Sequence, residues 1–74
     1  MEIGTVVKSL AGRDKGYLLT VVDVTEKGLL VCDGKERPLE RPKLKNPRHV
    51  EATGQSLSSM ASNRSLRKAL RELY

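Results

Sequence analysis

Three short apolar runs, set apart by turn residues, occupy the first half of the chain. They cover residues 4–10, 17–24 and 29–32, and each is rich in valine, threonine or leucine. Runs of this length and β-branched content are typical of strands and not of amphipathic helices. The pair Asp33-Gly34, a common hairpin signal, closes the third run. The pattern therefore predicts three strands joined as a meander.

The second and third runs carry apolar side chains on both faces of the predicted strands. An open sheet would leave one of those faces in water, so we expect the strands to close into a small barrel. Val21 and Val24 of the second run are predicted to lie in its core. The expected fold class is mainly β, with a small barrel over residues 1–54.

The region after the meander has a weaker strand pattern. Residues 35–39 can form a fourth strand, which Pro38 would keep brief or place at a sheet edge because proline cannot donate a ladder hydrogen bond. Two further prolines bracket residues 43–46, and this favours an extended loop that presents its lysines to solvent. Residues 48–51 are predicted to return as a last short strand.

The end of the chain has a different pattern. Residues 55–61 are rich in serine and poor in apolar residues, which predicts a linker. Residues 62–74 are predicted to form a short amphipathic helix that Ser62 or Asn63 caps. Its apolar stripe is Leu66, Ala69, Leu70 and Leu73, and its basic stripe is Arg64, Arg67, Lys68 and Arg71. A helix this short is not stable alone. We therefore expect its leucines to dock on the barrel, on a second copy or on a partner.

Charge is distributed unevenly over the 74 residues, whose net charge is +5. Residues 1–34 contain four basic and five acidic side chains, whereas residues 35–74 contain ten basic and four acidic ones. Clustered lysine and arginine gain free energy from counterion release on a polyanion, so the asymmetry favours such a partner. A solvated basic surface is the other interpretation that charge alone leaves open.

Several classes of function are disfavoured by composition. One histidine, His49, and one cysteine, Cys32, cannot supply a disulfide, a zinc site or a nucleophile–base pair. We therefore expect no enzyme, no catalytic residue, no metal, no cofactor and no small-molecule substrate. The apolar runs are far shorter than the roughly 20 residues that cross a bilayer, and the first residues lack a signal-peptide pattern. A soluble cytoplasmic protein is expected.

The turn Gly-Arg-Asp-Lys-Gly at residues 12–16 carries the most specific motif. Together with its flanking runs, the stretch from Gly4 to Val24 resembles the KOW motif, with Gly16 as the signature glycine. Residues 1–54 are similar to small bacterial KOW-domain proteins that are related to archaeal and eukaryotic large-subunit ribosomal proteins. The resemblance implies an SH3-like barrel that binds RNA. Pro38 and the serine-rich linker depart from the family pattern.

The resemblance and the charges together predict how RNA would be held. Two tyrosines and no phenylalanine or tryptophan make a base-stacking sheet improbable, so phosphate contacts should dominate. Asp14 is expected to fix the turn or to orient Arg13. Tyr17 is a candidate for stacking on a base, although packing at the rim suits it better. The predicted RNA-binding residues are Lys8, Arg13, Lys15, Gly16, Tyr17, Arg37, Arg41, Lys43, Lys45 and Arg48, with Arg64, Arg67, Lys68 and Arg71 as a second patch.

The predicted partner is RNA, in particular ribosomal RNA, with ribosomal proteins as further partners and no membrane. The alternative is a small barrel that binds proteins of the translation or transcription machinery, because barrels of this shape also bind peptides. Salt dependence separates the two classes, since binding through several phosphates weakens steeply with salt.

Overall fold

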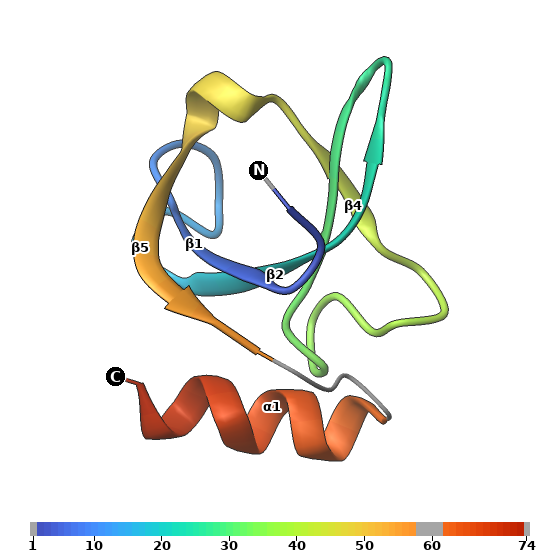
Figure 1. The fold of residues 1–74 in the computed structure, drawn as a ribbon, viewed down its shortest axis with the longest axis vertical. Coiled ribbons are helices and arrows are strands. Elements are labelled where there is room, and N and C mark those ends of the chain that lie inside the picture. Colours follow the sequence, from blue (N-terminus) through green and yellow to red (C-terminus); the bar gives the residue numbers. More distant parts are fainter. Residues whose placement is uncertain (1, 58–61, 74) are drawn as a thin grey trace.

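The computed structural model describes residues 2–57 and 62–73 and shows a mainly β fold with one helix in that part of the chain (Figure 1). Residues 58–61 of the predicted linker lie outside the described part, as do Met1 and Tyr74. The elements are β1 (Thr5–Ser9), β2 (Leu18–Thr25), β3 (Gly28–Cys32), β4 (Lys43–Lys45), the 3-10 turn η1 (Pro47–His49), β5 (Val50–Ser56) and α1 (Asn63–Glu72).

The strands form one antiparallel sheet in the order β4-β3-β2-β1-β5. The predicted meander of the first three strands is confirmed. β4 and β5 are the two edges, and over the described residues no pairing joins them, so the sheet is open and a closed barrel is not confirmed. The sheet is nevertheless strongly curved, and η1 carries the chain from one edge to the other (Figure 1).

The predicted fourth strand at residues 35–39 is wrong. The Asp33 carboxylate accepts hydrogen bonds from the N–H groups of Lys35 and Arg37, both over 2.9 Å, and so folds this segment into a tight loop. Those N–H groups are no longer available to a ladder. The fourth strand is instead β4, in the segment predicted to be a loop, where Leu44 pairs with Leu30 of β3.

The last strand is longer than predicted and begins later. Asn46 caps η1 by accepting a hydrogen bond from the Arg48 N–H over 2.9 Å, so residues 47–49 form a turn. β5 then runs past Thr53, whose hydroxyl donates to the Val6 carbonyl over 2.9 Å, and ends at Ser56. The first two residues of the predicted linker therefore belong to the sheet.

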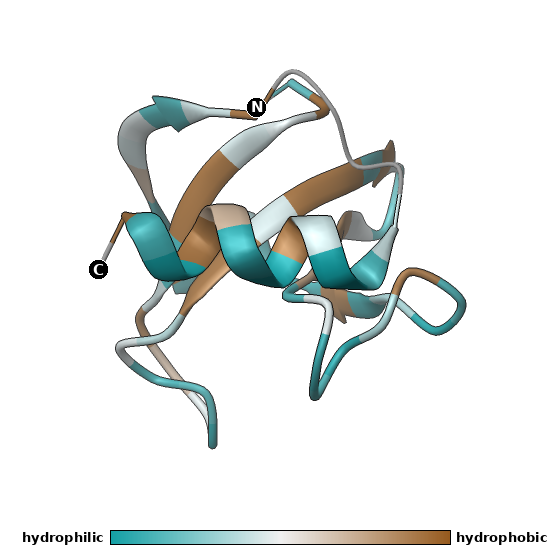
Figure 2. Ribbon diagram, turned by 90° about the horizontal axis from the view of Figure 1, so that it is seen from below, coloured by the Kyte–Doolittle hydropathy of each residue, from teal (hydrophilic) through white to brown (hydrophobic). Residues whose placement is uncertain are grey.

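The sheet has a core on each face. On the face turned away from α1, the buried side chains are Val7, Leu19, Val21, Leu29, Val31 and Val50. On the other face, Val6 and Cys32 pack against Leu66 and Leu70 of α1. Figure 2 shows the apolar strands behind the helix, whose hydrophilic residues face outward. The helix thus covers the second apolar face, for which the sequence predicted barrel closure.

The position of the core agrees only in part with the sequence prediction. Val21 is fully buried, as predicted, but Val24 is 49% exposed because it follows an irregularity in the β2–β3 register near the end of its strand. The predicted helix is confirmed, and its N-cap is Ser62, whose hydroxyl accepts a hydrogen bond from the Ser65 N–H. Across residues 2–57 and 62–73, no helix has the length and apolar character needed to cross a membrane.

Candidate nucleic-acid interface

The predicted basic turn joins β1 to β2 and is closed by backbone hydrogen bonds. The Gly16 N–H donates to the Ser9 carbonyl over 2.8 Å, and the Ser9 N–H donates to the Tyr17 carbonyl over 2.9 Å. Gly16 has a φ of +89°, and this left-handed conformation favours glycine. Arg13 and Lys15 are both exposed. The turn therefore holds two cations in solvent on a backbone frame of its own.

Asp14 connects this turn to the edge strand β4. Its Oδ1 accepts hydrogen bonds from the Ser9 hydroxyl and from the Lys45 ammonium, each over 2.7 Å. Lys45 Nζ also donates to the Ala11 carbonyl over 2.8 Å, and Lys43 Nζ lies 3.5 Å from Oδ2 of the same carboxylate. Of the two roles expected for Asp14, fixing the turn is the one that these contacts support.

The environment of Asp14 determines its protonation. Burial raises the pKa of the carboxyl, but hydrogen bonds from Lys45 and Ser9 and the charges of Lys45 and Lys43 outweigh burial and lower the pKa from 3.8 to about 2. The carboxylate is therefore fully ionised near neutral pH and neutralises the lysine that binds it.

Lys45, one of the predicted phosphate contacts, has a structural role. Its side chain is only 6% exposed, and its ammonium is committed to Asp14 and Ala11. The segment predicted to be an extended loop is a strand, in which every second side chain points inward. We therefore leave Lys45 out of the candidate interface, whereas Lys43 stays partly exposed at its edge.

The loop after β3 is held against the start of α1. Leu39 N–H donates to the Asn63 side-chain oxygen over 2.6 Å, and the Asn63 amide donates to the Glu40 carboxylate over 2.9 and 3.0 Å. Gly34 has a φ of +81°, and a Cβ there would lie 3.0 Å from the Arg67 backbone nitrogen. Backbone contact at Gly34 thus sets the distance between this loop and the helix.

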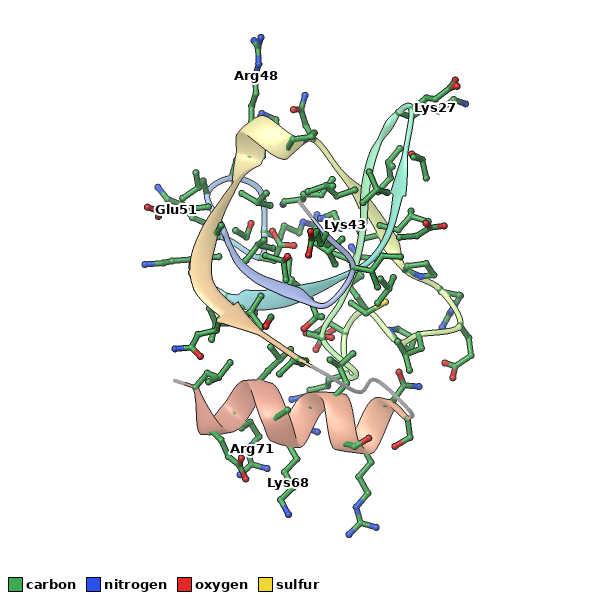
Figure 3. The ribbon with its side chains drawn as sticks, viewed as in Figure 1. Lys27, Lys43, Arg48, Glu51, Lys68 and Arg71 are labelled. Carbon is green, nitrogen blue, oxygen red and sulfur yellow. The ribbon has the colours of Figure 1, made fainter. Side chains whose placement is uncertain are left out.

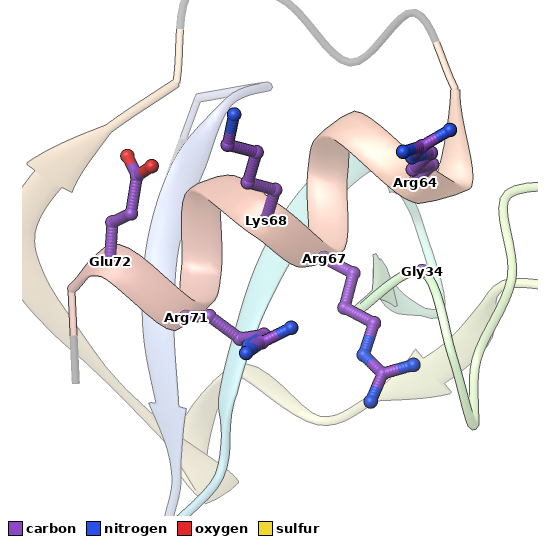
Figure 4. A pocket seen from close by; sticks show the side chains of 6 residues that line it. All are labelled: Gly34, Arg64, Arg67, Lys68, Arg71 and Glu72. Atoms are coloured by element: carbon purple, nitrogen blue, oxygen red, sulfur yellow. The ribbon is translucent and has the colours of Figure 1, made fainter.

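The outer face of α1 carries the strongest concentration of positive charge. All four residues of the predicted basic stripe are exposed. They line one hollow, named here the helix hollow, together with Gly34 and a single acidic residue, Glu72. Arg67 and Arg71 extend to one side of the helix, whereas Lys68 and Glu72 extend to the other (Figure 4). The helix hollow is thus lined by four basic residues and one acidic residue.

Two further hollows continue from the helix hollow toward the basic turn. The tyrosine hollow contains Tyr17, Leu18, Asp33, Lys35, Glu36, Arg67, Leu70 and Arg71. The turn hollow contains Arg13, Asp14, Tyr17, Leu19, Asp33, Glu36, Arg37 and Lys43. Neighbouring hollows share Arg67 and Arg71 at one junction, and Tyr17, Asp33 and Glu36 at the other. Four residues of the predicted first patch therefore lie on one surface with the second patch, namely Arg13, Tyr17, Arg37 and Lys43.

Positive charge falls along this surface from the helix to the turn. The tyrosine hollow has three basic and two acidic residues, and the turn hollow has three of each. Sequence reasoning missed the acidic residues Asp33 and Glu36. They reach this surface because β2 and β3 pair antiparallel, with Thr20 opposite Cys32, so the loop after β3 lies at the same end of the sheet as Tyr17. The available signal was the predicted meander, which brings the end of the third run beside the start of the second.

Six predicted residues line none of the three hollows. They are the buried Lys45, Lys15 and Gly16 of the basic turn, and Lys8, Arg41 and Arg48. Arg48 is on η1, at the opposite end of the molecule from Lys68 and Arg71 (Figure 3). Lys8 stands on β1 directly opposite Glu51 of β5. Arg41 is exposed but lines none of the three hollows. Lys8, Arg41 and Arg48 are therefore separate from the surface to which Tyr17 belongs.

Comparison with protein-family models and with curated proteins gives no match for this chain. In the described part of the chain, no group of three or more histidine, cysteine, aspartate or glutamate side chains is placed to hold a metal ion.

Proposed function

We propose that this protein binds RNA, in particular ribosomal RNA in the cytoplasm, and holds its phosphates on the outer face of α1 and on the turn between β1 and β2. The observation that carries the proposal is the helix hollow, whose lining contains four basic residues and one acidic residue, Glu72. The KOW resemblance of residues 4–24 supports it. In this proposal the curved sheet is an SH3-like barrel, with η1 and the Lys45–Asp14 ion pair bridging its open side.

The spacing of the arginines on α1 is unfavourable for the helix itself. Arg64, Arg67 and Arg71 are exposed and spaced three or four residues apart, so they repel one another and destabilise the helix by a few tenths of a kcal/mol per pair. The first turn of α1 has no acidic residue to offset Arg64. A phosphate placed between the arginines would remove this repulsion, and arginine can donate two hydrogen bonds to it.

The order of strength differs from the sequence prediction, in which the cations of α1 form the second patch. Acidic neighbours in the turn hollow balance its three cations, whereas the helix hollow keeps most of its charge. We therefore assign the main phosphate contacts to α1 and the supporting contacts to Arg13 and Lys15, which are exposed on their turn.

A salt titration of RNA binding tests the proposal. Each lost phosphate contact should reduce the slope of log affinity against log salt by about 0.7, the value for a single strand. We expect Arg67→Ala with Arg71→Ala to reduce the slope by about 1.4, and Arg13→Ala with Lys15→Ala to reduce it by less. The matched control is Lys27→Ala with Arg48→Ala, two exposed cations on other turns that should leave the slope unchanged.

Two results would overturn the proposal. Wild-type protein that fails to bind RNA at low salt would do so directly. Equal slopes for the helix variant and the control would show that the helix cations are only solvated. Salt-insensitive binding to a ribosomal protein, with no RNA affinity, would instead support the protein-interaction alternative.

A further inference from the structure

Acidic side chains are unexpected in a surface that holds phosphates. Tyr17, Asp33 and Glu36 line both the tyrosine hollow and the turn hollow, between the cations of α1 and those of the turn. Because a carboxylate repels a phosphate, an RNA strand that reaches from Arg67 to Arg13 would not place a phosphate there. A nucleobase suits this position, because its ring can stack on tyrosine and its N–H groups can donate to carboxylates.

We propose that Tyr17 and Glu36 form a binding position for one unpaired nucleobase, and that the preferred base is guanine. This inference rests on the proposed RNA-binding function and adds the kind of RNA segment that occupies the surface. That segment is an unpaired nucleotide whose neighbouring phosphates lie on α1 and on the basic turn.

Hydrogen bonds fix the backbone of Tyr17, whereas the residue itself is exposed to solvent. Tyr17 N–H donates to the Asp14 carbonyl, and its own carbonyl accepts from Ser9 N–H, both over 2.9 Å. The residue is nevertheless 51% exposed. Burial of a tyrosine ring usually stabilises a small fold, so an exposed ring at the junction of two charged hollows is available for a ligand.

The two carboxylates have different roles. Asp33 uses Oδ1 to accept the N–H groups of Lys35 and Arg37 and so holds the loop. Glu36 lies between those two residues, is exposed and, within the described residues, makes no ion pair or side-chain hydrogen bond. Asp33 is thus the positioning residue, and Glu36 is the acceptor that would contact a base.

Base chemistry gives the preference. Guanine presents two adjacent N–H donors on its Watson–Crick edge, which match the two oxygens of one carboxylate. Adenine and cytosine each offer one amino group, and uracil offers one N–H between two carbonyls that a carboxylate repels. We therefore expect guanine to bind most tightly and uracil least tightly.

The binding test compares two single-stranded oligomers by fluorescence anisotropy: all-uridine, and the same oligomer with one central guanosine. The guanosine should tighten binding by about fivefold, the lower end for a two-donor contact because the site is open to water. Glu36→Gln should abolish this preference while all-uridine binding persists. Tyr17→Ala should weaken binding of both oligomers by about fivefold, and Tyr17→Phe should retain the affinity.

A matched control and a direct readout accompany these variants. Leu44→Ala removes a side chain that is 47% exposed on β4, away from the hollows, and should bind like wild type. The chain has no tryptophan, so in a Tyr74→Phe background Tyr17 is its only tyrosine. Its fluorescence should be quenched when the guanosine oligomer binds.

The outcomes separate the two proposals. Steeply salt-dependent binding with no guanine preference, no quenching and no effect of Tyr17→Ala would overturn the base site and leave the phosphate site intact. Failure of wild-type protein to bind either oligomer at low salt would overturn both.

Discussion

The Lys45 ammonium lies 2.7 Å from Asp14 Oδ1 and thereby joins an edge strand of the sheet to the turn between β1 and β2. In strand order, β3 and β2 separate β4 from β1. The ion pair is thus a side-chain link across a sheet that backbone pairing leaves open, and it holds the basic turn in place beneath its exposed cations.

Replacing Lys45 should destabilise the fold. Lys45→Met leaves the Asp14 carboxylate, whose side chain is 14% exposed, without its main partner, so we expect the free energy of unfolding to fall by about 2–3 kcal/mol. Urea denaturation near neutral pH measures the change. Lys27→Met, at an exposed turn position, is the control and should change stability by less than about 0.5 kcal/mol. Equal effects of the two substitutions would show that the ion pair does not support the sheet.

The same carboxylate predicts a pH dependence. Because folding lowers the pKa of Asp14 from 3.8 to about 2, its stabilisation is complete above the higher value and disappears as the pH falls to the lower one. Wild type should exceed Asp14→Asn by about 2 kcal/mol near neutral pH. This difference should shrink as the pH falls through that interval. A difference that stays constant would show that the carboxyl has an ordinary pKa.

Two glycines should differ in their tolerance of a side chain. Gly16 and Gly34 both have a positive φ, but nothing lies within 4 Å of a Cβ at Gly16, whereas one at Gly34 would collide with the Asn63 carbonyl oxygen. Gly16→Ala should cost about 1 kcal/mol from backbone strain alone. Gly34→Ala should cost more, about 3 kcal/mol, because α1 must also move. Thermal denaturation ranks them, and the reverse order would contradict the contact between Gly34 and the helix.

The helix should be part of the cooperative fold. Leu66 is fully buried against Val6 and Cys32, so Leu66→Ala should lower the free energy of unfolding by about 3 kcal/mol. The exposed Leu44 provides the comparison, since Leu44→Ala should have little effect. Far-UV circular dichroism and urea denaturation should give the same midpoint for helix and sheet. A separate early loss of helix signal would show that α1 docks weakly.

Local patterns in the sequence predicted the first three strands, the basic turn and the helix. Gly16, the β-branched runs and the stripe of Leu66 and Leu70 are each interpretable over a few residues, because turn chemistry and periodicity act locally. The structure also settles the open choice of docking surface, since these leucines pack on the sheet of the same chain.

The errors arose where distant residues decide the outcome. Residues 35–39 do not form a strand because the Asp33 side chain accepts hydrogen bonds from the N–H groups of Lys35 and Arg37. Residues 43–45 form a strand because they pair with the edge of β3 that β2 leaves unpaired. The structural role of Lys45 depends on Asp14, 31 residues earlier, and no local pattern reports it. Glu36 likewise lines the same hollows as Tyr17 through the pairing of β2 with β3, and its local sequence does not report this.

The position of α1 after the sheet in the chain has a consequence for synthesis. Cys32 is made before Leu66, so at roughly 5–20 residues per second several seconds pass before the helix can cover it. In the folded protein, burial and the charges of Asp33 and Glu40 raise the pKa of the Cys32 thiol to about 11, which keeps it protonated and unreactive. On a nascent chain the same thiol is open to alkylation. Labelling of Cys32 therefore shows whether α1 has already packed on its face of the newly made sheet.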